Sequence, residues 1–378
     1  MTLINIKAIA RKEFYHLLRD YRSLYLAFAI PLLLILLFGY ALSLDVNNIP
    51  TVVVDQDRTD LSRDFLRKLE ASSYFTILAY QTSSAEATLF LDEGRAALAV
   101  IIPPGWTAKL RADRAAPMQF ILDGSDPNFA NLSRSYVTAF IEQFNGQLAH
   151  AFLNRQGLRT INPPVEGRIR VWFNEELESR NFIVPGIMAI IIMIVGAMLT
   201  SLVIAREYEN GTMETIRSLP VTAGEFLLGK AFPYFFIALT DVLISVLMGQ
   251  LLFGVVMKAN FRLLLLASSL YIAVALSLGL FISSVTKSQL VANQTAVLVT
   301  YLPSLLLSNF VFPVANMPQV LQILTAVVPA TYYIKILSGI YLKNIGFLHL
   351  WPSFAVLAIM FLVLAGLNWA ALKKEGLS

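Results

Sequence analysis

The first candidate for chemistry is the stretch from Gly224 to Lys230, whose two glycines and lysine have the spacing of a phosphate-binding loop. Ala231, however, stands where such a loop carries the serine or threonine that holds magnesium, and three bulky apolar residues fill its middle. The segment also begins with residues that start a helix, whereas a phosphate loop needs free backbone amides after a strand. The sequence therefore indicates no nucleotide site, and any ATP that drives this protein must be hydrolysed elsewhere.

Metal and nucleophilic chemistry are not indicated either. The three histidines, His16, His150 and His349, are too far apart to show metal-ligand spacing. Cysteine is absent from the sequence, which excludes thiolate metal sites and disulfides. We therefore expect no catalytic residue, no metal site and no cofactor in this chain, which is not expected to be an enzyme itself.

Asp241 is the one acid deep inside an apolar run, where a charge is costly and often functional. It has two interpretations that the sequence leaves open. The carboxyl group either faces a substrate path, where it can also take a proton, or forms a hydrogen bond to a neighbouring helix, for example to Asn293 or Gln294. Asn309 adds another amide to the same late segment, and such amides either line a polar path or hold helices together.

The composition indicates that much of the chain lies in a lipid bilayer. Of the 378 residues, 57% are hydrophobic and 14% are charged, well below the charged fraction of about a quarter in soluble domains. The apolar residues gather in runs of about 20, long enough to cross a hydrocarbon core of roughly 30 Å. We expect an α-helical polytopic membrane protein with six spans, at residues 23–44, 183–205, 232–257, 263–285, 290–312 and 351–372.

Two further apolar segments are not expected to cross the membrane. Residues 1–22 have a helical pattern, with Leu3, Phe14 and Leu17 on one face and cationic side chains opposite, typical of an amphipathic interfacial helix. A cleaved signal peptide is the alternative, but the apolar run that follows is too long for one. Residues 313–346 are broken by prolines into pieces too short to span, which favours re-entrant or interfacial helices.

Residues 45–180 differ from the rest in carrying charges of both signs. Short β-rich runs alternate with helical ones, from Thr51–Val54 through a long helix at about Asn128–Arg155 to a last strand at Ile169–Phe173. This alternation predicts a compact α/β domain inserted between the first and second spans. It lies outside the cytoplasm if the amino terminus is cytoplasmic. That orientation places eleven lysines and arginines of the termini and short loops inside and four outside, as the positive-inside rule requires.

The cytoplasmic segment 206–231 contains a short predicted helix at 212–219. Asn210 and Gly211 break the second span, Thr212 is expected to cap the new helix, and Glu214 lies in its first turn, where the helix dipole favours an acid. Pro220 ends it. Apolar residues at three-residue spacing form a small ridge along it: Met213, Ile216 and Leu219.

Thr222 and Glu225 then match the capping box that starts a helix, here the third span. The result is a short helix held between two spans at the base of the bundle. It either transmits force from a soluble partner or merely seals the bundle.

The chain resembles the type-2 ABC exporter permeases, in particular a bacterial branch with a large outer domain between spans one and two. The resemblance covers essentially the whole length, and the segments that carry it are RKEFYHLLRD, IPLLLILLFGYAL, FILDGSDPN, RVWFNEELESRNFIVPGIMAI, AREYENGTMETIRSLPVT, GKAFPYFF, LPSLLLSNFVFPVANMP and VVPATYYIKIL.

The resemblance implies a half-transporter in the bacterial inner membrane that pairs with a second permease, itself or a paralogue, and docks two separate ATPase subunits, which bind the ATP and magnesium. In this family the short helix acts with the amino-terminal helix at the ATPase interface. The residues that match this motif or line its ridge are Glu207, Gly211, Thr212, Met213, Glu214, Ile216 and Pro220.

The same resemblance implies a periplasmic domain at 45–180 that extends the conduit toward an adaptor protein, and a drug-like, xenobiotic or lipid-like substrate. Membrane lipid is the other expected partner, and no nucleic-acid partner is expected. Two other classes of function compete: an ion-coupled secondary transporter, which needs ion sites that a single Asp241 does not supply, and a sensor or assembly protein that recognises partners through the outer domain.

Substituting the short helix tests its role. Glu214→Arg and Gly211→Pro are expected to abolish substrate-stimulated ATPase activity of the assembled complex without preventing membrane insertion, because they alter the helix that receives the force. The measurement is ATPase activity with and without substrate, beside the amount of inserted permease. Unchanged stimulation in both variants contradicts the coupling role.

Overall fold

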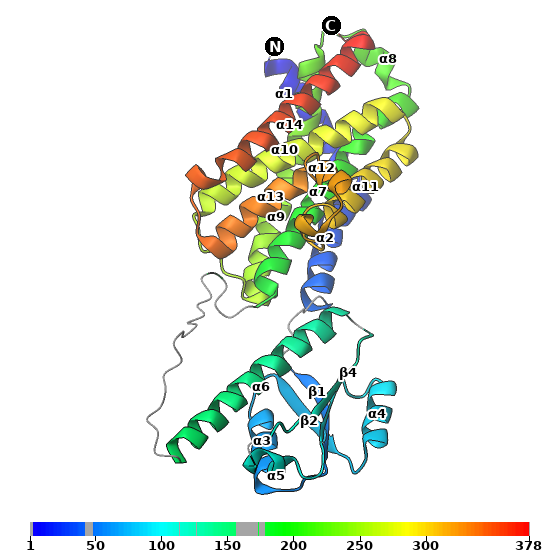
Figure 1. The fold of residues 1–378 in the computed structure, drawn as a ribbon. Helices are drawn as coiled ribbons and strands as arrows, with labels where there is room; N and C mark the ends of the chain where they lie inside the picture. Colours follow the sequence, from blue (N-terminus) through cyan, green and yellow to red (C-terminus); the bar gives the residue numbers. More distant parts are fainter. Residues whose placement is uncertain are drawn as a thin grey trace. The chain divides into compact units, whose positions relative to one another are not determined.

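The computed structural model describes residues 3–41, 48–112, 114–125, 127–155, 173 and 178–377. The chain divides into two compact units (Figure 1). One unit combines Met1–Ser43 with Val171–Ser378 and is helical; the other, Leu44–Arg170, contains the sheet.

The helical unit is an assembly of long helices with short ones between them. Its α-helices are α1 (Leu3–Arg19), α2 (Tyr21–Ala41), α7 (Arg180–Glu209), α8 (Thr212–Arg217), α9 (Ala223–Phe253), α10 (Phe261–Thr286), α11 (Gln289–Leu306), α12 (Gln319–Thr325), α13 (Pro329–Ser338) and α14 (Phe347–Lys374). A 3₁₀ turn, η1 (Val314–Asn316), precedes α12, and a π-helical turn, η2 (Gly339–Lys343), follows α13.

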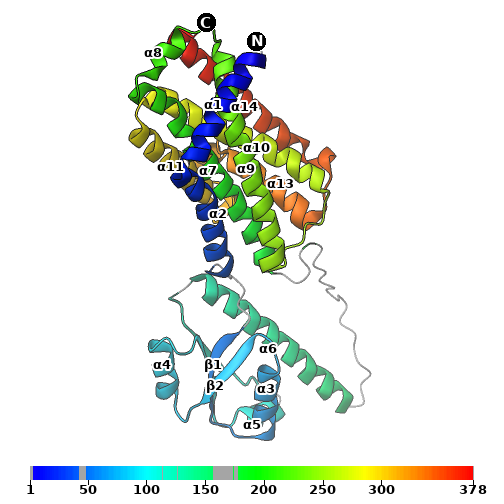
Figure 2. The same cartoon turned by 180° about the vertical axis from the view of Figure 1, so that it is seen from behind.

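Helix α7 is the centre of this unit. It packs against α2, α9, α10, α11 and α13, as both views in Figures 1 and 2 show. Its most apolar 18-residue window is 83% buried, whereas that of α14 is 22% buried. An apolar helix that is covered on all sides is a core element, so movement of α7 must move several neighbours with it.

Four described helices, α7, α9, α10 and α14, are long and apolar enough to cross a membrane. The bent pair formed by α12 and residues 329–343 supplies a fifth if it counts as one span. The predicted span 23–44 falls on α2 and extends beyond the described residues. The helix at the predicted span 290–312 is shorter than that span, because α11 ends at Leu306. The structure thus supports a polytopic membrane protein with four to five candidate spans, and six remains a prediction.

The predicted short helices of 313–346 are α12, α13 and their flanking turns. The two helices meet at an angle of 77°, with Pro329 at the first position of α13. Proline is favoured there because the first residues of a helix need no backbone donor. The bend fits a broken span or a re-entrant loop.

The other unit is an α/β domain, as its sequence pattern predicts. It contains β1 (Ile49–Asp55), α3 (Asp60–Glu70), β2 (Phe75–Tyr80), α4 (Ser84–Asp92), β3 (Leu98–Ile102), α5 (Trp106–Arg111), β4 (Gln119–Leu122) and α6 (Pro127–Arg155). The strand order is β2-β1-β3-β4, with β4 antiparallel and the other three parallel. The predicted strand at Ile169–Phe173 lies outside the described residues except for Phe173.

Helices cover both faces of this sheet. Val53 of β1 packs with Phe65, Trp106 and Phe144 of α3, α5 and α6, whereas its neighbour Val52 packs on the opposite face with α4. Successive side chains of a strand point to opposite faces, so a strand buried on both sides needs an unbroken run of apolar residues. The run Val52–Val54 therefore marks β1 as a central strand.

In the helical unit, Gly279 of α10 allows the closest approach to α7. A Cβ atom there would overlap Thr200 Oγ1 and the Ala197 carbonyl oxygen and lie 2.9 Å from Ala197 Cα. Thr200 also donates a hydrogen bond to the carbonyl of Leu276 across the same contact, 3.1 Å away. The missing side chain thus permits direct bonding between the two helices.

Gly279→Ala is therefore expected to destabilise the protein by about 1–3 kcal/mol through overpacking. Gly366→Ala in α14 is the matched control, because no atom lies within 4 Å of its added Cβ and alanine favours a helix by about 1 kcal/mol over glycine. Thermal unfolding of the purified protein in detergent should show a lower Tm for Gly279→Ala alone. Equal Tm values for the two variants contradict the close-approach explanation.

A candidate coupling site built on a buried lysine

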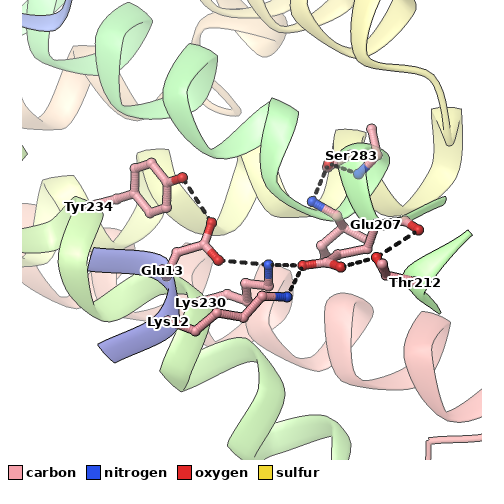
Figure 3. Close-up of polar contacts among 9 residues, drawn as sticks. Lys12, Glu13, Glu207, Thr212, Lys230, Tyr234 and Ser283 are labelled. Carbon is pink, nitrogen blue, oxygen red and sulfur yellow. Dashed lines mark hydrogen bonds and ion pairs between the residues drawn. The ribbon is translucent and has the colours of Figure 1, made fainter. Parts of the chain in front are cut away.

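Lys230 lies at the centre of a buried ion cluster that joins three helices (Figure 3). Its ammonium nitrogen is 2.7 Å from Glu13 Oε2 on α1 and 2.5 Å from Glu207 Oε1 on α7. The exposed fractions of the three side chains are 3%, 2% and 7%. Charges removed from water require compensation, so Lys230 of α9 holds α1 and α7 beside it.

Lys12 and Tyr234 complete the cluster. Lys12 lies 3.0 Å from Glu207 Oε1, and the Tyr234 hydroxyl donates a hydrogen bond of 3.1 Å to Glu13 Oε1. Two lysines and two glutamates leave no net formal charge. Lys12 is 58% exposed, so the buried part depends mainly on Lys230.

The same carboxylate connects the cluster to the short helix α8. The Thr212 hydroxyl donates to Glu207, both to a carboxylate oxygen and to the backbone carbonyl at 3.3 Å. Just before Glu207, α7 is hydrogen-bonded to α10. Ser283 Oγ of α10 accepts hydrogen bonds from the amides of Ile204 and Ala205, at 3.0 and 2.8 Å. Glu207 is thus the residue at which α7, α8 and α9 are bonded together.

The packing of α1 explains how Glu13 reaches this cluster. Ile9, Glu13 and Leu17 are one turn apart, and Glu13 and Leu17 are buried while Ile9 is half-buried. Gly229 provides the space, because a Cβ atom there would lie 2.7 Å from Ile9 Cβ and 3.2 Å from the Ile6 carbonyl oxygen. The start of α1 is fixed as well, since Asn5 Nδ2 donates to the Pro220 carbonyl at 3.2 Å and to Glu225 at 3.0 Å.

The face of α1 that packs differs from the predicted apolar face. Leu17 is buried as part of it, but Leu3 and Phe14 are 82% and 52% exposed, and the buried charge Glu13 takes their place. The reason is the ion cluster, which an apolar pattern does not reveal. Lys12 is one of the cationic residues expected opposite the apolar face, and it is exposed, yet it also reaches Glu207.

The predicted short helix is present but shorter, from Thr212 to Arg217 instead of 212–219. Gly211, not Thr212, is its N-cap, with a φ of 69° that favours glycine, while Thr212 bonds to Glu207 instead. Met213 is buried, Ile216 is half-buried, and Glu214 is exposed. The capping box of Thr222 and Glu225 is confirmed, with backbone-to-side-chain bonds of 3.1 and 3.3 Å.

Further ion pairs hold α8 against the end of α14. Arg217 lies 3.1 Å from Glu375, and Lys287, in the turn between α10 and α11, lies 2.6 Å from the same carboxylate. The inner face of α8 is thus fixed at several points, whereas Glu214, Thr215 and Ser218 remain exposed. This arrangement leaves one face of α8 free for a partner.

The predicted polar residues of the spans are not brought together. Asp241 on α9 is 5% exposed, and no hydrogen-bond partner for its Oδ2 atom is found among the described residues. Asn293 and Gln294 lie on α11, where Gln294 is exposed and the buried Asn293 Oδ1 atom also has no described partner. Asn309 lies beyond α11 at a φ of 65°, where it accepts a hydrogen bond of 2.9 Å from the Val314 amide.

Sequence reasoning missed four members of this site: Lys12, Glu13, Lys230 and Tyr234. Lys230 was considered only as part of a false phosphate loop and as a cytoplasmic charge. The usable signals were Glu13 within the apolar stripe of α1 and the one-turn spacing of Lys230 and Tyr234 near the start of an apolar helix. However, Glu13 of α1 and its partners Lys230 and Tyr234 of α9 are more than 200 residues apart in sequence, so neither signal alone pairs them.

Comparison with known proteins identifies the family. The model of a family described as ABC-2 family transporter protein matches residues 22–370. This chain belongs to the ABC-2 transporter family. The resemblance to ABC exporter permeases seen in the sequence is thereby confirmed.

The relatives of this ABC-2 permease include proteins of Escherichia coli K12. The chain is 34% identical over 377 residues to the probable multidrug ABC transporter permease YbhS, covering 98% of this chain and 97% of that protein. It is 29% identical over 354 residues to the probable multidrug ABC transporter permease YbhR, covering 93% and 94%. It is 27% identical over 315 residues to the inner membrane transport permease YhhJ, covering 82% of each.

Removing the central charge tests the cluster. Lys230→Met leaves two buried carboxylates without their main counter-ion, so it is expected to cost about 3–5 kcal/mol of stability. Lys12→Met is the matched control, since its exposed ion pair is worth about 0–1 kcal/mol. Thermal unfolding in detergent should separate the two variants clearly.

Adding Glu13→Gln and Glu207→Gln to Lys230→Met should restore part of the loss, because no uncompensated charge then remains. If Lys230→Met is as stable as Lys12→Met, the buried cluster does not hold the helices together.

Proposed function

We propose that this ABC-2 permease is the membrane subunit of an exporter driven by separate ABC ATPase subunits. It moves a drug-like, xenobiotic or lipid-like substrate out of the cytoplasm or the inner leaflet. Support for the role comes from the family, and support for the substrate class from relatives named as probable multidrug permeases. The observation that carries the mechanism is a chain of polar contacts that starts at α8. Thr212 of α8 bonds to Glu207 of α7, and Lys230 of α9 pairs with both Glu207 and Glu13 of α1.

In this mechanism the exposed face of α8 receives the force. Glu214 lies on that face, while the buried Met213 and the Thr212 hydroxyl attach α8 to the bundle. Displacement of α8 pulls on Glu207, and through Lys230 it moves α1 and α9 together with α7. Because α7 is the packed centre of the unit, the displacement spreads to the helices around it.

The remaining parts of the assembly follow from the same proposal. Both termini and α8 lie in the cytoplasm, and the α/β unit lies in the periplasm, where it meets an adaptor protein. A second permease, identical or a paralogue, completes the pore. The ATPase subunits bind ATP and magnesium, and this chain performs no hydrolysis. The relative named as an inner membrane permease supports the bacterial inner membrane as the location.

Glu207→Gln tests the force path with almost no change in shape. We expect the ATPase subunits to co-purify with this variant, but substrate-stimulated ATPase activity and transport to fall by at least about tenfold, because the neutral amide loses its charge-assisted bonds to Lys230 and Lys12. Glu209→Gln is the control: it lies two residues away and is exposed, and its partner is Gln289 of α11. It should retain activity near that of the unmodified protein.

Two results contradict the proposal. If Glu207→Gln is as active as Glu209→Gln, force does not pass through the cluster. If the solubilised permease never co-purifies with a stoichiometric P-loop ATPase, the exporter assignment itself fails, and the sensor or assembly function is favoured. Transport that survives ATP depletion and collapses with the proton gradient favours the secondary transporter.

A further inference from the structure

A basic hollow lies where α1, α2, α7 and α11 meet, and none of the residues that line it belongs to the ion cluster. Its volume is about 480 Å³, and it is lined by His16, Arg19, Asp20, Arg206, Asn210 and Gln289. These residues come from the end of α1, the joint between α1 and α2, the end of α7 and the start of α11. No residue of the proposed force path lines it.

The charges of this hollow favour an anion. Two guanidinium groups face one carboxylate, and His16 adds a donor. Arg206 is 3.7 Å from Asp20, longer than a hydrogen bond, so this pair leaves Arg206 with donors to spare. For Arg19, no acidic partner is found in the described part of the chain. Arginine donors arranged around a hollow match the oxygens of a phosphate group.

The position of the hollow along the helices favours a lipid over a soluble anion. Arg206 directly follows the last residue of the apolar stretch 183–205, and α2 begins just after Asp20. Apolar side chains are exposed beside the polar lining residues, with Leu18 before Arg19 and Leu290 after Gln289, at 54% and 67% exposure. A ligand with a phosphate and apolar chains satisfies both kinds of surface.

We propose that this hollow binds the phosphate headgroup of an anionic glycerophospholipid such as phosphatidylglycerol. Arg19 and Arg206 bind the phosphate oxygens, and the acyl chains run along the exposed apolar residues of α1 and α11. This lipid site lies in the cytoplasmic leaflet, and its placement there rests on the orientation of the chain given under the proposed function. Basic pockets between helices on that side of a membrane are a recurrent form of lipid headgroup site.

Such a lipid would act next to the coupling site. Arg206 and Glu207 are consecutive residues at the end of α7, one lining the hollow and the other bonded to Lys230. A bound headgroup would join the end of α1 to α7 beside the ion cluster, so the lipid composition of the membrane would influence how firmly α1 is docked.

The test is lipid binding by the purified, delipidated permease, followed by native mass spectrometry and by thermal stabilisation on addition of phosphatidylglycerol, phosphatidylethanolamine or inorganic phosphate. We expect phosphatidylglycerol to bind and stabilise the protein more than the zwitterionic lipid does. Arg19→Gln should weaken that binding by about fivefold, the effect of one arginine at a lipid surface. Arg19 is exposed, so folding should be retained, and the elution profile checks this.

Arg11→Gln is the control, because it removes the same charge from the same helix at an exposed position that does not line the hollow. It should bind phosphatidylglycerol as the unmodified protein does. Equal weakening in both variants, equal binding of the two lipids, or the same stabilisation by inorganic phosphate alone would each overturn the proposal. The assay uses no ATPase, so failure of the exporter assignment would leave its result standing.

Discussion

An ammonium group buried among apolar helices must have carboxylates within hydrogen-bonding distance, and this requirement organises the end of the bundle that carries α8. Lys230 meets it with Glu13 of α1 and Glu207 of α7, which lie on either side of the α/β unit in the sequence. Loss of either carboxylate would leave a buried positive charge partly uncompensated. The docking of α1 against α9 is therefore an electrostatic necessity of the fold, supported by the missing side chain at Gly229.

The end of α7 that carries Glu207 has two roles. Glu207 binds the lysine and the hydroxyl of Thr212, while the preceding residue, Arg206, lines the basic hollow. Further along, the close approach at Gly279 fixes α7 against α10. A helix held this way cannot shift alone, because packed interiors transmit displacement to their neighbours. That property suits a force path that begins at a helix of only six residues.

Local patterns predicted much of the fold. The alternation of strands and helices in the α/β unit, the capping box at Thr222 and the break at Gly211 depend on residues close in sequence, and all are present. The rejection of the phosphate-like pattern also agrees with the structure, since Gly224–Lys230 lies within α9 and its lysine is bonded to two carboxylates.

What the sequence did not predict depends on contacts between distant segments. Glu13 was not identified as a member of the site, because its partner Lys230 lies 217 residues away. Thr212 was expected to cap α8, but Gly211 is the N-cap, and the Thr212 hydroxyl donates to the Glu207 carboxylate. Asn309 was placed in a span because its neighbours are apolar, whereas the chain turns there with a φ of 65°.

The most direct test of the account is whether α1 and α9 move as one body during the ATPase cycle. The sequence has no cysteine, so spin labels at Lys7→Cys on α1 and Leu228→Cys on α9, both exposed positions, report the distance between these helices. Complexes labelled at only one of the two positions identify the distances between permease copies. Pulsed electron paramagnetic resonance on the complex should give the same distance distribution without nucleotide and with ATP trapped in the ATPase subunits. A distribution that shifts or splits when ATP is trapped would show that the Lys230 cluster opens in the cycle, and the account would be wrong.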